Sequence, residues 1–228
     1  MSLLAGARNS QRVNTGQQFA LADDFYLIGL DDRTSRPRLH AKAMSLGTAA
    51  ALLSELVLAN YIRVTAGRFE VAYRYRRAPE PELATMMDVI IAEPHHTMPT
   101  WLAYFAQTST DVVLERLVKS GFLREESSKG LLRSKSTYMP TDQSALSWRS
   151  LRIAHVINKR DVRTWEDLAL IGLLVATRLT DFVLWNADPT DRESLKVILG
   201  GLNDEPSLHA LISQVEALIA AAVLAQRK

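Results

Sequence analysis

The fold is decided by the segment Leu46-Gly47-Thr48-Ala49-Ala50-Ala51-Leu52-Leu53-Ser54-Glu55-Leu56-Val57-Leu58, in which nearly every residue is apolar. Its apolar residues recur at intervals of three and four, which places one set on a single face of an α-helix: Leu46, Ala49, Ala50, Leu53, Leu56 and Val57. The opposite face carries few polar side chains, so little of this helix favours water. The segment therefore predicts a helix that is buried inside a domain.

A short β-hairpin is predicted directly after this helix. Tyr61-Ile62-Arg63-Val64 and Phe69-Glu70-Val71 are strand-like, and Ala66-Gly67 between them is typical of a turn. The same order of helix, strand and glycine turn recurs later in the chain. There, an amphipathic helix over Asp111–Ser120 ends at Gly121, and a second hairpin follows, with a turn at Ser127–Gly130 and Leu131-Leu132-Arg133 as its second strand.

Further helices are predicted in the second half of the chain. Thr164-Trp165-Glu166-Asp167 resembles a capping box, and an apolar helix over Leu168–Trp185 follows it. A last helix places its apolar residues on one face: Leu208, Leu211, Ile212, Val215, Leu218, Ile219 and Ala222. The fold class is therefore mainly α, a helical bundle around buried apolar helices with two small β-hairpins. We expect the early apolar helix and the one after Trp165 to lie side by side.

Length and composition allow one or two globular domains and fit a reducing compartment. The chain has 228 residues, 47% of them hydrophobic, a net charge of +2 and no cysteine. Residues 1–19 carry Arg8 and Arg12 but no acidic residue up to Gln18, which predicts a flexible basic tail before a single domain over residues 20–228. The longest apolar stretches, Leu168–Ala176 and Ala217–Ala225, are shorter than the roughly 18 residues of a membrane-spanning helix. A cytoplasmic protein, with any membrane contact peripheral, is therefore expected.

No motif of an enzyme or a metal site is found in the sequence. The chain lacks G-x-S-x-G, a glycine-rich phosphate loop and H-E-x-x-H. The neighbouring carboxylates Asp23-Asp24 and Asp31-Asp32 are interpreted as solvated residues at helix edges. We therefore predict no catalytic residue, no metal ligand and no cofactor.

The order of several motifs resembles the Golgi phosphoprotein 3 family. The resemblance is carried by L-x-x-D-x-Y-L-I-G-L-D-D at Leu21–Asp32, by Arg38-Leu39-His40, by the helix ending in Glu55-Leu56-Val57-Leu58, and by Leu117–Leu123 and Asp167–Ile171. It covers nearly the whole chain after about residue 20 and implies a non-catalytic peripheral membrane protein that binds phosphatidylinositol 4-phosphate. The Ala- and Leu-rich composition indicates a bacterial branch of the family.

The resemblance also implies a headgroup pocket in which one tryptophan and three arginines hold the 4-phosphate. The tryptophan position falls on His40, and the three arginine positions fall on Ala49, Gln107 and Thr110. Because guanidinium groups offer forked donors to phosphate oxygens, these replacements remove most of the charge-assisted contacts of the family. The basic neighbours Arg38 and Lys42 remain to recruit an anion. The sequence thus predicts anionic lipids as partners, without firm specificity for one phosphoinositide.

The second hairpin resembles a membrane-inserting element of the family. Leu131 and Leu132 would supply an apolar contact, and Arg133 and Lys135 would meet anionic headgroups. Equally, the two leucines could pack on the domain or on a second subunit. Both interpretations stay open from sequence, and the second would make the protein a self-associating interaction module without lipid binding.

A winged-helix protein that binds nucleic acid is the other alternative. Basic residues gather around both hairpins: Arg63, Arg68, Arg74, Arg76 and Arg77 at the first, and Arg124, Lys129, Arg133 and Lys135 at the second. However, the early helix is too apolar to read a DNA groove, and the net charge of +2 is low for such a protein. Nucleic acid is therefore the less favoured partner.

Overall fold

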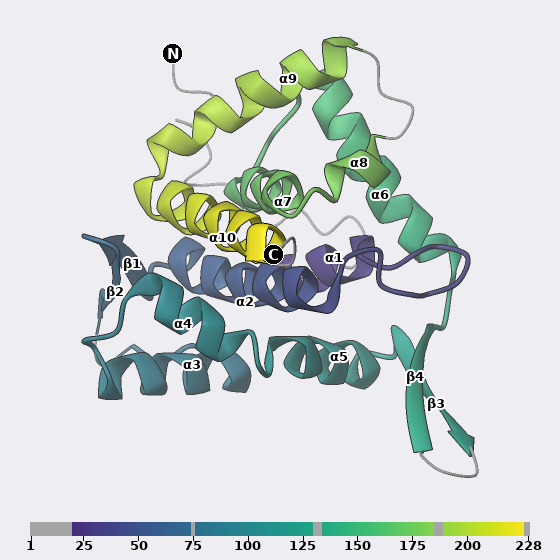
Figure 1. Ribbon diagram of the computed structural model, residues 1–228, viewed down its shortest axis with the longest axis horizontal. Coiled ribbons are helices and arrows are strands. Elements are labelled where there is room, and N and C mark those ends of the chain that lie inside the picture. Colours follow the sequence, from purple (N-terminus) through teal and green to yellow (C-terminus); the bar gives the residue numbers. More distant parts are fainter. Residues whose placement is uncertain (1–19, 74–75, 130–133, 185–188, 226–228) are drawn as a thin grey trace.

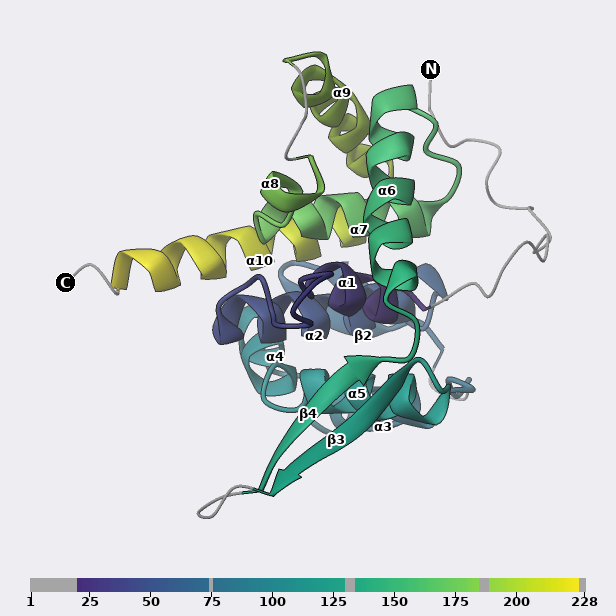
Figure 2. The same ribbon diagram turned by 90° about the vertical axis from the view of Figure 1, so that its right-hand side faces the viewer.

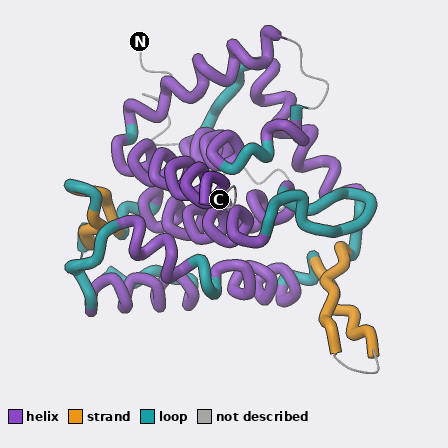
Figure 3. Tube along the Cα trace, in the orientation of Figure 1, coloured by secondary structure: helices purple, strands orange, loops and turns teal. Residues whose placement is uncertain are grey.

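The computed structural model of the protein describes residues 20–73, 76–129, 134–184 and 189–225. Within them the elements follow in the order α1 (Leu21–Ile28), α2 (Ala41–Leu58), β1 (Ile62–Thr65), β2 (Arg68–Val71), α3 (Pro81–Ala92), α4 (Met98–Phe105), α5 (Ser109–Lys119), β3 (Leu123–Lys129), β4 (Ser134–Pro140), α6 (Ser144–Lys159), α7 (Trp165–Ala176), α8 (Thr180–Val183), α9 (Pro189–Gly200), the 3₁₀-helix η2 (Gly201–Asp204) and α10 (Pro206–Ala225). Helices dominate the chain, and the strands form two separate antiparallel hairpins (Figures 1 and 3). The predicted mainly α fold class is confirmed.

Helix α2 lies at the centre of the hydrophobic core. It contacts α1, α5, α7 and α10, and these helices surround it in Figure 1. Its side chains Ala49, Leu53 and Leu56 are fully buried. Helix α7, which is also apolar around its circumference, belongs to the same hydrophobic cluster. The expectation that the two apolar helices share one interior is therefore confirmed.

A glycine in α2 lets α1 approach closely. A Cβ atom at Gly47 would lie 2.2 Å from Cζ of Phe25, a distance that no packed pair of carbon atoms adopts. Phe25 is fully buried on α1, so its ring occupies the space that a side chain at position 47 would need. This contact sets the separation of the first two helices.

Buried charges tie α1 to two other helices. Asp23 accepts a hydrogen bond from Nε of Arg116 on α5 at 2.7 Å, and Glu55 on α2 pairs with the same guanidinium at 3.3 Å. The backbone N–H of Ala22 also donates to Glu55. Burial raises the pKa of the Asp23 and Glu55 carboxyl groups, and the Arg116 charge opposes that rise. The interpretation of Asp23 as a solvated residue is therefore wrong.

Asp24 connects α1 to α6 through a second set of ion pairs. Its carboxylate contacts Nε of Arg149 at 2.9 Å and Arg152 at 3.3 Å. Arg152 continues to Asp167 at the start of α7, at 2.6 Å. The adjacent aspartates of α1 thus connect it to α5 through Asp23 and to α6 through Asp24. Because Asp24 is engaged in these ion pairs, its interpretation as a solvated residue is wrong as well.

The two helix–hairpin units share one backbone geometry. Asn60 after α2 and Gly121 after α5 have φ angles of 57° and 75°, which reverse the chain into the first strand of each hairpin. In both units the next N–H bonds back to a helical carbonyl at 2.9 Å, from Tyr61 to Leu56 and from Phe122 to Leu117. The repeated pattern of the sequence therefore reflects a repeated helix end.

Two element boundaries differ from the predictions. The second hairpin is longer, because β3 continues to Lys129 and β4 starts at Ser134. The predicted turn at Ser127–Gly130 is therefore wrong, and Leu131, Leu132 and Arg133 lie outside the described residues, as does the tail over residues 1–19. The helix after Trp165 ends at Ala176 rather than at residue 185, because Arg178 adopts a left-handed φ of 63° before α8 begins.

Helix α10 packs with its first half only. Leu208, Leu211 and Val215 are fully buried, whereas Val223 and Leu224 are 46% and 63% exposed. Figure 2 shows the helix leaving the body and extending beyond it. By length and composition, two helices among the described residues could cross a membrane, α2 and α10. Of these, α2 is a core helix with 67% of its apolar window buried, and α10 has only 22% buried.

Candidate functional site

A surface hollow of about 730 Å³ lies beside the start of α2. Its lining comes from α1, the loop before α2, α2 itself and α5: Tyr26, Arg36, Pro37, Leu39, Ala41, Met44 and Thr110. The wall is thus largely apolar, with one guanidinium and two hydroxyl groups. A hollow with this lining fits a small anionic group that carries an apolar portion.

Hydrogen bonds around Asp31 fix the conformation of the loop over residues 31–38, which carries Arg36 to the hollow. The Asp31 carboxylate accepts hydrogen bonds from the backbone N–H of Thr34 at 2.8 Å and of Arg33 at 3.1 Å. These bonds, with that of the Thr34 hydroxyl, lower the pKa of Asp31, so its anchoring charge persists in mild acid. The Asp31 N–H in turn donates to the Arg36 carbonyl at 2.8 Å. Arg36 itself is exposed, and no carboxylate of the described chain pairs with it.

Arg38 stabilises the same loop through its side-chain contacts. Its guanidinium pairs with Asp31 at 3.3 Å and Asp32 at 3.1 Å, and it donates to the Leu30 carbonyl at 3.0 Å. It also lies 5.5 Å above the ring of Phe182. Arg38, predicted from sequence to help recruit an anion, therefore has its charge already neutralised by two carboxylates.

The start of α2 offers a positive helix end. His40 is the N-cap, and its Nδ1 accepts a hydrogen bond from the Lys42 N–H at 3.4 Å. No acidic residue occurs in the first turn, so no carboxylate there compensates the positive end of the helix dipole. The Lys42 side chain is exposed and has no carboxylate partner in the described part of the chain. Such helix ends attract anions.

Tyr26 provides a buried hydroxyl group in the hollow. The residue is only 6% exposed, and burial raises its pKa to about 12, so the phenol stays protonated and can donate a hydrogen bond. Among the described residues its hydroxyl has no hydrogen-bond partner. Thr110 faces the same hollow from the first turn of α5, where the neighbouring Ser109 hydroxyl donates to the Ser45 carbonyl at 2.9 Å. That bond fixes the start of α5 against α2.

The structure brings only part of the predicted site together. Thr110 lines the hollow, and His40 lies between its lining residues Leu39 and Ala41. Ala49 is fully buried farther along α2, and Gln107 is exposed in the turn between α4 and α5. Lys135, predicted for the second hairpin, belongs to β4, where its backbone pairs with Ser128.

Three lining residues were not predicted from sequence. Tyr26 reads as an ordinary core aromatic of α1, and Met44 as an ordinary residue of the apolar helix. Arg36 could have been found as one of three arginines in the loop before α2. Nothing in the pattern, however, indicated that Arg38 pairs with carboxylates while Arg33 and Arg36 pair with none that the structure describes.

The arginines of the two hairpins are partly neutralised. Arg63 pairs with Glu70 at 2.9 Å and Arg124 pairs with Glu126 at 2.8 Å, in each case within one hairpin. The helix that precedes the first hairpin is the buried α2, which leaves it no face for a DNA groove. Both observations argue against the winged-helix alternative. The described residues also contain no group of three His, Asp or Glu side chains placed to hold a metal ion.

A comparison with protein families gives one match. A family model described as Golgi phosphoprotein 3 (GPP34) matches residues 21–224. The match begins at the first residue of α1 and includes the hollow, both hairpins and nearly all of α10. A search of curated proteins found no match.

Proposed function

Because the chain belongs to the Golgi phosphoprotein 3 family, we propose that it is a peripheral membrane protein that binds anionic lipid headgroups at the hollow beside α2. The observation that carries this proposal is the convergence of donors there. The unpaired Arg36, the exposed Lys42, the unpartnered hydroxyl of Tyr26 and the positive N-terminal end of α2 all lie in or beside one hollow. No catalytic role is proposed for these residues.

The donors suit a phosphate group that is bound mainly through charge. Arg36 and Lys42 would neutralise the phosphate, while Tyr26 and Thr110 would donate to its oxygens. The family pocket, in which three arginines surround the 4-phosphate, has no equivalent in Ala49, Gln107 and Thr110. We therefore propose that the density of anionic lipid, rather than the position of one phosphate on inositol, governs binding.

Vesicle co-sedimentation tests this function. Vesicles of phosphatidylcholine alone are compared with vesicles that also contain phosphatidylglycerol or phosphatidylinositol 4-phosphate. Binding should rise with the anionic fraction and weaken as salt increases, because salt screens the attraction to the surface. If no anionic vesicle carries the protein into the pellet, the proposed function fails.

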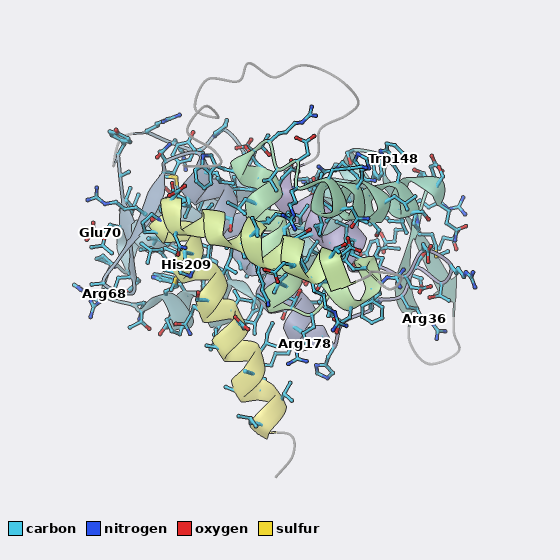
Figure 4. The ribbon with its side chains drawn as sticks, turned by 90° about the horizontal axis from the view of Figure 1, so that it is seen from above. Arg36, Arg68, Glu70, Trp148, Arg178 and His209 are labelled. Carbon is cyan, nitrogen blue, oxygen red and sulfur yellow. The ribbon has the colours of Figure 1, made fainter. Side chains whose placement is uncertain are left out.

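Reversing the charge at Arg36 should weaken vesicle binding by about 30-fold. The Arg36→Glu substitution removes one favourable cation and adds one repelling anion, each worth about 1 kcal/mol near an anionic surface. Arg68→Glu is the matched control, since Arg68 is an exposed residue of β2 far from Arg36 (Figure 4). Equal losses in both variants would show that net charge, and not the hollow, determines binding.

A further inference from the structure

We propose that the outer half of α10, Ala217–Ala225, is an apolar arm that enters the interface of an anionic bilayer. The inference rests on the proposed membrane function and adds a second contact to it, separate from the hollow. It names the part of the chain that meets the acyl region, whereas the hollow meets the headgroup.

The arm is apolar around its whole circumference but is only partly covered, because Leu218 and Ile219 pack against the core while Val223 and Leu224 near its end are exposed. Its sequence is Ala-Leu-Ile-Ala-Ala-Ala-Val-Leu-Ala, with no polar residue between Glu216 and Gln226. Val223 and Leu224 are 46% and 63% exposed, whereas the first half of the same helix is buried against α2 and α7. A helix that is apolar on every side is normally enclosed by protein or lipid. Burial of the exposed end of α10 in an apolar environment outside the described fold would therefore be favourable.

The length of the arm fits one leaflet and no more. Nine helical residues extend about 13 Å, compared with a hydrocarbon core about 30 Å thick. The first half of α10 cannot follow the arm into lipid, because Leu208, Leu211 and Val215 are part of the protein core. After Gln226 the sequence continues with Arg227 and Lys228, two residue types whose charged ends favour headgroups over acyl chains. The arm therefore lies along the interface rather than crossing the bilayer.

The charges beside the arm favour lipid over a second copy of the chain. Arg36 and Arg178 lie on the side of the body toward which α10 extends (Figure 4). Neither pairs with a carboxylate in the described ranges, so both leave an unpaired guanidinium on this side. Two copies that met through their arms would bring these arginines together, and like charges oppose such a contact. An anionic bilayer would neutralise them while it covers the arm.

A second exposed apolar pair provides a matched control. Trp148 and Leu151 are 68% and 62% exposed on the outer face of α6. Figure 4 places Trp148 on the opposite side of the body from the end of α10. Exposure alone would give both pairs equal affinity for lipid. The proposal instead assigns lipid contact to the arm, because the arm is a run of nine apolar residues whereas Trp148 and Leu151 stand among the polar residues Ser147, Arg149, Ser150 and Arg152.

A fluorescent label at the arm tests insertion directly. The chain has no cysteine, so Leu224→Cys and Leu151→Cys each provide one site for an environment-sensitive dye such as NBD. With phosphatidylcholine–phosphatidylglycerol vesicles, the dye at position 224 should shift to shorter wavelength and gain intensity, and the dye at position 151 should not change. If the labelled protein sediments with vesicles while the dye at position 224 keeps its spectrum in water, the proposed insertion of the arm is wrong. Binding at the headgroup would not be contradicted by that result. Failure to sediment would instead reject the headgroup function.

Polar substitution in the arm should weaken binding to the same vesicles by at least about tenfold, through the loss of apolar burial. The test variant combines Val223→Gln with Leu224→Gln, which keeps the net charge and a helix-forming side chain. The control combines Trp148→Gln with Leu151→Gln, and its binding should stay within about twofold of the unmodified protein. Unchanged binding of the arm variant would contradict the proposal. If the mass measured by light scattering also halved in that variant, the arm would be identified as a contact between two copies.

Discussion

Replacing Arg116 with methionine is expected to lower the free energy of unfolding by about 3–5 kcal/mol at neutral pH. The Arg116→Met substitution keeps most of the side-chain volume but leaves the carboxylates of Asp23 and Glu55 buried without their cation. An uncompensated buried charge costs far more than an exposed ion pair contributes. Urea unfolding followed by circular dichroism measures the loss.

The loss should shrink as the pH falls. Burial already raises the pKa of Asp23 above its ordinary 3.8 and that of Glu55 above 4.5, and Arg116 opposes both rises. Without Arg116 both folded-state values rise further. A carboxyl group with a raised folded-state pKa contributes stability that is present at low pH and is lost as the pH rises through that pKa. The variant should therefore approach the unmodified protein between neutral pH and about pH 5.

Neutral partners provide the control for this effect. Adding Asp23→Asn and Glu55→Gln to the Arg116→Met variant removes both buried charges, so a large part of the lost stability should return. The difference from the unmodified protein should then vary little with pH over the same range. A pH-independent loss in the single variant would mean that packing, rather than uncompensated charge, explains the effect.

A valine at position 47 should cost about 3 kcal/mol or more of unfolding free energy. Its Cβ atom would lie 2.2 Å from Cζ and 2.7 Å from Cε1 of the buried Phe25 ring, so α1 and α2 could not keep their separation. Glycine and valine differ by only a few tenths of a kcal/mol in helix propensity. The measured loss would therefore report the clash between the two helices.

Two further variants test that explanation for Gly47. Gly200→Val introduces the same side chain in α9, where an added Cβ meets no atom within 4 Å, and its effect should stay near ±0.5 kcal/mol. In a Phe25→Ala background, Gly47→Val should cost less than it does alone, because the ring that it strikes is gone. Strictly additive losses would show that the ring contact is not the cause.

The sequence predicted the local structure of this protein well wherever a short pattern was sufficient. The Thr164 side chain caps α7 by accepting from the Asp167 N–H at 3.1 Å, as the capping box indicated. Leu146, Ile153 and Ile157, whose spacing suits one face of a helix, form the buried side of α6. The end of α7 was missed, because the stop comes from the backbone conformation of Arg178 in an otherwise apolar run.

The candidate site was predicted less completely than the helices. The resemblance pointed to the region around His40 and Thr110, and the structure places Thr110 at the hollow and His40 beside it. It could not show that Arg38 forms ion pairs with Asp31 and Asp32 while Arg36 has no carboxylate partner within the described structure. The arginines of this loop are alike in sequence, and only the folded loop determines which of them meets a carboxylate. Which charged residues form ion pairs depends on the positions of their side chains in the fold, and sequence spacing does not give those positions.

The sequence by itself determined which segments are helical, which of them are apolar, and that the chain belongs with the Golgi phosphoprotein 3 family. These properties follow from periodicity and motif order, which are local. Only the tertiary structure decided that Asp23 is buried and Asp24 half-buried against arginines, and that the apolar helix α10 is covered along its first half while its end, with Val223 and Leu224, is exposed. An apolar or charged side chain is stabilised by whatever packs against it, and its partners come from distant parts of the chain.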